Sequence, residues 1–167
     1  MTAQPSQQLI LDASAIIDLY LGDALGTFLE TPYRFAAPDQ IIAELLDPAG
    51  EVVVMMGVSR VALSSAQVLE SLALKSQYPR LSSGDAQAFL LARDANAVLL
   101  TGDGLLRFLA ENAGVVVHGV LWALDQIEAA GLMAGPALAA SLRKMLEEGA
   151  RLPDDGVEER LTRWERS

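Results

Sequence analysis

The sequence predicts an α/β fold in which helices cover both faces of a central, mostly parallel sheet of about five strands. Short apolar runs with strand propensity alternate with longer segments of helical period. Such alternation is typical of βαβ units, whose right-handed crossovers align successive strands. The chain has 167 residues, 51% of them hydrophobic, which is enough for one domain with a sizeable core.

The first half of the chain contains three expected strands, at residues 8–12, 33–37 and 59–63. Helices are expected over residues 13–21, in a further piece ending near residue 30, and over residues 39–46 and 66–76. Ser14 is a possible cap of the first helix. Pro38 stops the second strand and stands where proline suits a helix start, and Pro48 and Gly50 end the helix that follows. Residues 51–58 are left open, because their valines favour a strand while their spacing also suits a helix.

The second half alternates in the same way. Strands are expected at residues 97–101 and 115–117, and helices at residues 83–96, 104–112, 119–130 and 136–148. Gly114 and Gly131 stand where a helix is expected to end. Residues 151–167 are heavily charged, with Leu161 and Trp164 as their apolar anchors. We expect a terminal helix packed through these two residues; a disordered tail is the alternative.

Composition excludes several kinds of chemistry. Without cysteine, the chain has no disulfides, zinc–thiolate sites or thiol catalysis, and its one histidine, His118, excludes multi-histidine metal sites within one chain. No apolar run is long enough to span a membrane, and the start, from Met1 to Gln8, is polar and lacks a signal core. We therefore expect a cytoplasmic protein with no membrane contact. The net charge of −10 is unfavourable for holding a polyanion, unless bound divalent ions invert it locally.

Four acidic residues in separate segments suggest a metal site: Asp12, Glu44, Asp85 and Asp103. All but Glu44 stand where a strand stops or a helix starts. In a parallel sheet, ligands bind outside the carboxyl ends of the strands. Carboxylates gathered there would repel one another unless a cation lay between them, and magnesium or manganese prefers such oxygen ligands. This pattern indicates metal-assisted chemistry on a phosphate ester.

Each of these acids also has an ordinary structural interpretation. Asp12, Asp85 and Asp103 suit helix caps, and Ser82 makes a capping box with Asp85 plausible. Glu44, taken alone, suits the solvent-facing stripe of its helix.

The neighbouring polar residues divide in the same way. Ser14 and Thr101 could support the acids, and Arg107 could contact a phosphate, although a solvated arginine is the more frequent case. Asp18 and Asp94 are interpreted as surface acids. His118 suits a packed or capping position better than a general base, and Trp122 suits a core or interface position.

The order of these motifs resembles the PIN-domain ribonucleases, in a VapC-like branch. The motifs lie at residues 9–17, 38–46, 81–92 and 98–107, and residues 115–132 resemble the family's continuation. The resemblance implies a three-layer α/β/α PIN-like nuclease domain, which we place at residues 1–150, with residues 151–167 as a helix packed on it. Asp12, Glu44, Asp85 and Asp103 match the family's metal-binding acids, and Ser14 and Thr101 match its supporting hydroxyls.

The resemblance implies a magnesium- or manganese-dependent endoribonuclease, in which water attacks phosphorus in line. Members of the family are often toxins restrained by a small antitoxin, and often homodimers, so RNA, an antitoxin and a second copy are the expected partners. Two features depart from the pattern. The chain is strongly acidic, and residues 51–76 contain no recognisable landmark.

Two other classes of function remain as alternatives. One is a catalytically degenerate PIN fold that acts only as a binding module. The other is a phosphoaspartyl protein, either a phosphatase or a receiver. A dehalogenase-type phosphatase needs an aspartate two positions after Asp12, where this chain has Ser14. A receiver needs an aspartate at the end of its middle strand and a late lysine, and neither stands where needed.

Overall fold

The computed structural model describes residues 6–167, which form a five-stranded parallel sheet with the strand order β3-β2-β1-β4-β5. Every neighbouring pair of strands is parallel, which confirms the predicted fold class. The strands are β1 (Gln8–Leu11), β2 (Arg34–Pro38), β3 (Ser59–Val61), β4 (Val98–Leu100) and β5 (Val117–His118).

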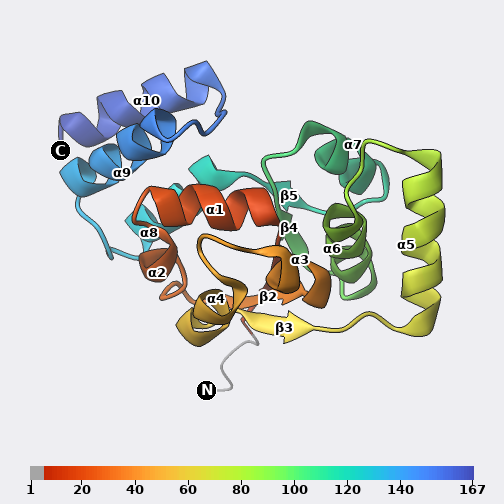
Figure 1. The fold of residues 1–167 in the computed structure, drawn as a ribbon. Coiled ribbons are helices and arrows are strands. Elements are labelled where there is room, and N and C mark those ends of the chain that lie inside the picture. The colour runs from red at the N-terminus through yellow and green to blue at the C-terminus, as the bar shows by residue number, and fades with distance from the viewer. Residues whose placement is uncertain (1–5) are drawn as a thin grey trace.

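Helices cover both faces of this sheet, so that the molecule has three layers (Figure 1). On one side lie α3 (Asp39–Glu44), α5 (Ser65–Gln77), α6 (Ser83–Asp94) and α7 (Gly104–Asn112), with α4 (Gly50–Met56) beside α3. On the other side lie α1 (Ala13–Leu21), α2 (Leu25–Phe28) and α8 (Val120–Ala129), with α9 (Gly135–Glu147) and α10 (Asp154–Glu165) outside them.

The strand order contains a reversal that fixes where a ligand can bind. The chain runs outward from β1 to β2 and β3, then returns to the other side of β1 to form β4 and β5. Ligands of open α/β sheets bind at such a switch point, outside the carboxyl ends of the two strands that flank it. Here these are the ends of β1 and β4, and the backbone N–H of Asp12 donates a 3.1 Å hydrogen bond to the carbonyl of Leu100 there.

The two central strands form the middle of the core. Leu9, Leu11, Leu99 and Leu100 are completely buried, because β1 and β4 are covered on both faces. Such strands have continuous apolar runs rather than alternating ones. The two buried central strands, β1 and β4, therefore end directly at the switch point.

Some local expectations were wrong or were left open. Residues 51–58 contain helix α4 up to Met56, which buries Val53 and leaves Met55 exposed. The last strand lies at Val117–His118 instead of residues 115–117, because these two residues pair with Leu99 and Leu100 of β4, whereas Val116 is 55% exposed. Ser14 is not the cap of α1; the cap is Asp12, whose carboxylate accepts from the backbone N–H of Ala15.

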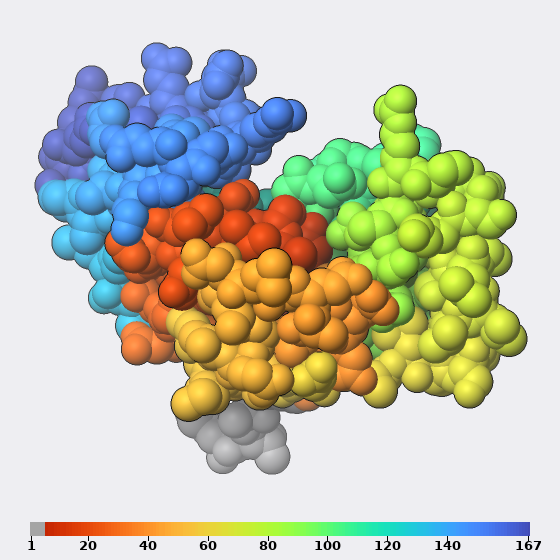
Figure 2. All heavy atoms as spheres, viewed as in Figure 1, coloured from red at the N-terminus to blue at the C-terminus, as the bar shows by residue number. Residues whose placement is uncertain are grey.

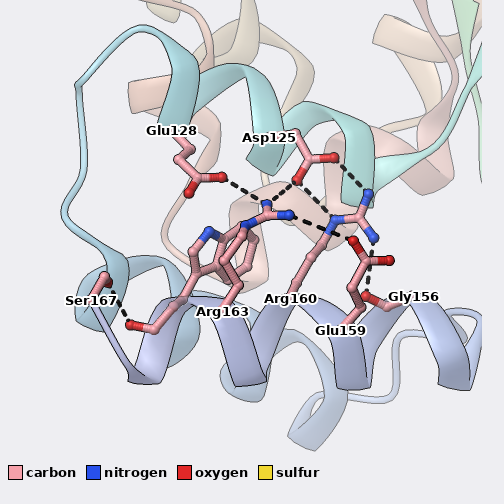
Figure 3. Close-up of polar contacts among 8 residues, drawn as sticks. Asp125, Glu128, Gly156, Glu159, Arg160, Arg163 and Ser167 are labelled. Atoms are coloured by element: carbon pink, nitrogen blue, oxygen red, sulfur yellow. Dashed lines mark hydrogen bonds and ion pairs between the residues drawn. The ribbon is translucent and has the colours of Figure 1, made fainter.

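Residues 151–167 contain helix α10, which packs on α9 and α8. Trp164 is fully buried and Leu161 is partly buried, as the sequence indicated. Figure 3 shows Asp125 of α8 held between Arg160 and Arg163 of α10. The Arg160 side chain forms two bonds to this carboxylate, of 2.5 and 2.9 Å. This geometry excludes a disordered tail over α10.

Across residues 6–167, no helix combines the length and the apolar character that crossing a membrane requires. The polar start noted in the sequence falls partly on residues 1–5, which lie outside the described part of the chain.

Candidate active site

Asp12 lies at the end of β1 and is only 1% exposed. Its carboxylate accepts hydrogen bonds from the hydroxyl of Ser14 at 2.9 and 3.0 Å, from the Ala15 N–H at 2.8 Å, and from the hydroxyl of Thr101. Within residues 6–167, no lysine, arginine or histidine pairs with it. A carboxylate so deeply buried normally has a positive partner.

Burial raises the pKa of Asp12 from its ordinary 3.8 to about 7. The hydrogen bonds from Thr101, Ala15 and Ser14 hold this pKa down, whereas the negative charge of Asp85 raises it further. Near neutral pH the ionised form of this group is therefore costly in the metal-free protein, and a bound cation would favour it.

A hydrogen-bond network joins the ends of β1 and β4. The Thr101 hydroxyl donates to Asp12 and accepts from the N–H of Asp103 at 3.0 Å. The Ser14 hydroxyl donates to Asp12 and accepts from the N–H of Gly102 at 3.3 Å. The two hydroxyls that the sequence suggested as supports thus fix both the orientation of the Asp12 carboxylate and the turn that presents Asp103.

Asp85 stands in the first turn of α6, whose N-cap is Ser82. Its pKa is raised, first by partial burial and then by the charges of Asp103 and Glu44, while hydrogen bonds with Ser82 oppose the rise. Gly84 brings this turn close to α3, since a Cβ at that position would lie 2.8 Å from a side-chain carbon of Ile41. A larger residue at position 84 would separate the starts of α6 and α3.

Glu44 and Asp103 complete the acidic group at its exposed side. Glu44 is the last residue of α3 and accepts a 2.5 Å bond from Gln40. Asp103 caps α7 by accepting a 2.8 Å bond from the Leu106 N–H. The charge of Asp85 acts on Asp12, and those of Glu44 and Asp103 act on Asp85, so the members of this acidic group are within electrostatic range of one another.

This donor set fits a hard divalent ion better than a transition metal that needs nitrogen or sulfur. Within residues 6–167, no three acidic or histidine side chains are placed so that they could hold a metal ion together. Magnesium keeps several waters and is usually bound through one or two carboxylates, so a partial protein shell satisfies it. The group of Asp12, Glu44, Asp85 and Asp103 is compatible with such an ion.

Other residues lie differently from their expected positions. Asp18, expected on the surface, is half-buried, and this burial raises its pKa. It lies in α1 more than one turn beyond Asp12, with its neighbours Ile17 and Leu19 packed in the core. Asp94 is exposed and pairs with Arg93 at 2.8 Å. His118 stacks on Trp122, with ring centroids 4.2 Å apart, and its pKa is lowered by burial and by the charge of Arg107.

Two pockets flank the acidic group. One, of about 460 Å³, is mainly apolar and runs from Ala13 to Glu44 and Leu46. The other, of about 410 Å³, adjoins Thr101 and is lined by Arg107, Trp122 and Arg151 among others. Sequence reasoning named Arg107 but missed Arg151, because nothing in the charged C-terminal segment indicates which of its arginines lines this pocket.

Comparison with known proteins shows similarity over most of the chain. The family described as "DUF3368: PIN domain" matches residues 8–166. Among solved structures, a PilT N-terminus domain protein from the hyperthermophilic archaeon Sulfolobus solfataricus P2 is similar, with a TM-score of 0.54 and 16% sequence identity. The similarity covers 72% of this chain and 93% of that one. No curated protein matches the sequence.

Proposed function

The chain belongs to the PIN-domain family, and on that premise we propose that it is a magnesium- or manganese-dependent endoribonuclease. The observation that carries the proposal is Asp12, a buried carboxylate at the switch point of the sheet that has no basic partner among residues 6–167. A buried acid of this kind is costly to ionise, and a divalent cation among Asp12, Glu44, Asp85 and Asp103 would compensate for that cost.

These four acids would hold the ion. When bound, it would lower the pKa of water and neutralise charge on the phosphate. Ser14 and Thr101 hold the Asp12 carboxylate in one orientation, so its oxygens need not reorganise. Asp85, in the first turn of α6, would also orient the attacking water. Arg107 lies in α7, one turn beyond Asp103, and would contact a phosphate of the substrate.

A cleavage assay tests this function. A panel of short RNAs is incubated with the protein in EDTA, in Mg²⁺ and in Mn²⁺, and the same panel is incubated with Asp12→Asn. We expect cleavage by the wild type with metal, and none in EDTA or with Asp12→Asn. Metal-dependent cutting that persists unchanged in Asp12→Asn would refute the proposal.

A second candidate function is a degenerate PIN domain that binds RNA or protein without cutting. It is favoured by the absence, within residues 6–167, of three closely convergent metal-binding side chains. A protein of this kind would show no measurable affinity for Mn²⁺. A phosphoaspartyl function is less well supported, and labelling by acetyl phosphate tests it.

Partner proteins form the finer part of the proposal. We propose that the chain is the VapC-like toxin of a toxin–antitoxin pair and that it forms a homodimer. The net charge of −10 supports pairing with a basic antitoxin. Leu46, Met55, Leu69 and Leu72 are each more than half exposed, which supports a partner on the side of α4 and α5. Co-purification of a small basic protein tests the first proposal, and light scattering of the purified chain tests the second.

A further inference from the structure

We propose that the 410 Å³ pocket between the end of the sheet and the C-terminal helices is a second RNA subsite, in which Arg107 and Arg151 bind a backbone phosphate next to the acidic group. This inference rests on the proposed nuclease function and adds to it a residue, Arg151, from outside the motifs that resemble the family. It also gives helix α10 and the segment before it a role in binding the substrate.

The pocket combines positive charge with apolar walls. Arg107 enters from α7, and one of its guanidinium nitrogens lies 3.3 Å from the point where a Cβ on Gly119 would be. Arg151 enters from the connection between α9 and α10, and it is exposed and forms no ion pair with any of residues 6–167. Val120, Leu121 and Leu152 are among the apolar residues that line it. Guanidinium groups bind phosphate oxygens in a bidentate manner, and apolar walls suit a ribose or a base.

The position of the pocket agrees with a continuous RNA strand. Thr101 lies both in the wall of the pocket and in a hydrogen bond with Asp12. The Thr101 N–H donates a 3.0 Å bond to the carbonyl of His118, so the ends of β4 and β5 form one edge. A phosphodiester held at the acids would therefore place a neighbouring nucleotide along this edge, toward Arg107 and Arg151.

On the face viewed in Figure 2, the molecule is hollowed between the C-terminal helices, in blue, and the segment containing α6 and α7, in green. Figure 1 places the connection between α9 and α10 at the end of the C-terminal pair that is nearer to β5 and α7. The residues that line the pocket come from both of these parts of the chain, with Arg107 in α7 and Arg151 in the connection between α9 and α10.

Helix α10, which follows the C-terminal wall of the pocket, packs closely on α8. Gly156 of α10 packs so closely on α8 that a Cβ there would lie 2.8 Å from a methyl carbon of Leu121. Arg160 donates two hydrogen bonds to the carboxylate of Asp125 in α8. It also donates a 3.0 Å hydrogen bond to the carbonyl of Gly156 (Figure 3). These contacts anchor the start of α10, which directly follows the pocket residues Arg151, Leu152 and Pro153.

The negative charge of the four acids and the positive charge of the two pocket arginines would act on RNA in opposite ways. The acids would repel an RNA strand except where a metal ion neutralises them, while the arginines attract it to the adjoining edge. The net charge of −10 is then compatible with RNA binding, because the positive charge is placed where the strand must lie.

Binding of a fluorescein-labelled, mixed-sequence RNA twelve-mer, measured by anisotropy in Ca²⁺, tests the proposal, because Ca²⁺ also takes carboxylate oxygens as ligands and so neutralises the acids. Gel electrophoresis after the titration checks that the RNA is uncut. Arg151→Gln should weaken binding by about tenfold or more, the loss expected for one charge-assisted phosphate contact. The slope of log affinity against log salt should become shallower by about 0.7. The matched control is Arg166→Gln, which removes the same charge from the exposed end of the same segment and should change neither quantity. Thermal melting checks that both variants are folded.

A second readout reports on the pocket itself. Trp122 lines it, whereas Trp164 is fully buried elsewhere, and the chain has no other tryptophan. In a Trp164→Phe background, the emission of Trp122 should change as the RNA saturates. Adding Arg151→Gln should shift that titration to higher RNA concentration.

The outcomes separate this inference from the proposed function. If the wild type cuts RNA with Mn²⁺ but Arg151→Gln binds RNA as tightly as the wild type, the subsite is refuted and the nuclease stands. If Arg151→Gln loses affinity while the wild type cuts nothing, the subsite stands and the nuclease proposal fails. A wild type that does not bind RNA, or an equal loss in Arg166→Gln, also refutes the subsite.

Discussion

Thr101 donates its hydroxyl hydrogen to the carboxylate of Asp12, although 89 positions separate the two residues in the sequence. This bond crosses between the ends of β1 and β4, at the point where the strand order reverses. The same hydroxyl accepts from the N–H of Asp103. One side chain thus links two of the acids that we assign to the metal site.

Replacing this hydroxyl tests the link. Thr101→Val keeps the shape of the side chain and leaves a lone pair of Asp12 and the N–H of Asp103 without their partner. We expect a loss of about 1–3 kcal/mol in the free energy of unfolding, measured by urea titration. Because the bond lowers the pKa of Asp12, its removal raises that pKa, and the acid limb of the pH–cleavage profile should move to higher pH. Thr101→Ser, which keeps the hydroxyl, should show neither effect.

The stability of the metal-free protein should depend on the ionisation of Asp12. Its pKa is about 7 in the folded chain, whereas an ordinary aspartate, as in the unfolded chain, has a pKa of 3.8. Folding therefore favours the protonated form. The stability contributed by the proton is fully present below about pH 4 and is lost as the pH rises through about 7. The difference in pKa corresponds to up to about 4 kcal/mol.

Asp12→Asn isolates this contribution from those of Asp18 and Asp85, whose pKa values are also raised. In EDTA at pH 8, we expect the variant to be more stable than the wild type by thermal or urea unfolding. The difference should shrink as the pH is lowered to 4, where Asp12 of the wild type is protonated. A variant less stable than the wild type at pH 8 would show that burial of the charge costs little.

The acids on the exposed side should matter for activity and hardly at all for folding. Glu44→Gln removes a charge from the exposed end of α3, so its unfolding free energy should stay within about 0.5 kcal/mol of the wild type. Its Mn²⁺-dependent RNA cleavage should fall by about tenfold or more. Glu147→Gln, which changes another exposed glutamate, on α9, is the control and should cut normally. Equal rates for both variants would remove Glu44 from the site.

Trp164 should carry much of the attachment of α10. Trp164→Ala leaves a cavity at a fully buried position and should cost about 3–5 kcal/mol. Limited proteolysis should then cut the chain between α9 and α10 faster than in the wild type. The indole N–H has no hydrogen-bond partner within residues 6–167, so Trp164→Phe should cost much less. An alanine variant as protease-resistant as the wild type would show that the ion pairs of Asp125 suffice.

The sequence predicted the parts of the fold that depend on local pattern. Apolar runs ended by Asp12 and by Thr101 marked the central strands, because a strand covered on both faces has no polar positions. It could not decide between strand and helix for residues 51–58, since β-branched residues with helical spacing suit both. That choice was made by packing on α3, where a Cβ on Gly50 would overlap the carbonyl of Ile42.

The residues of the candidate site could be predicted from local sequence patterns only in part. Asp12, Asp85 and Asp103 stand at strand ends and helix starts, which topology brings to one edge. The burial of Asp18 and the position of Arg151 in the wall of a pocket depend on contacts between segments that are distant in the sequence. The contact of α10 with α8 is an example. Such contacts leave no periodic signal, so neither could have been read from the chain alone.

The central claim is that Asp12 and its neighbours form a site for a divalent cation, and calorimetric titration of Mn²⁺ at pH 8 tests it most directly. The wild type should give a saturable heat of binding, and Asp12→Asn should bind at least about tenfold more weakly. Absence of saturable heat in the wild type, or equal affinity in the two proteins, would contradict the claim.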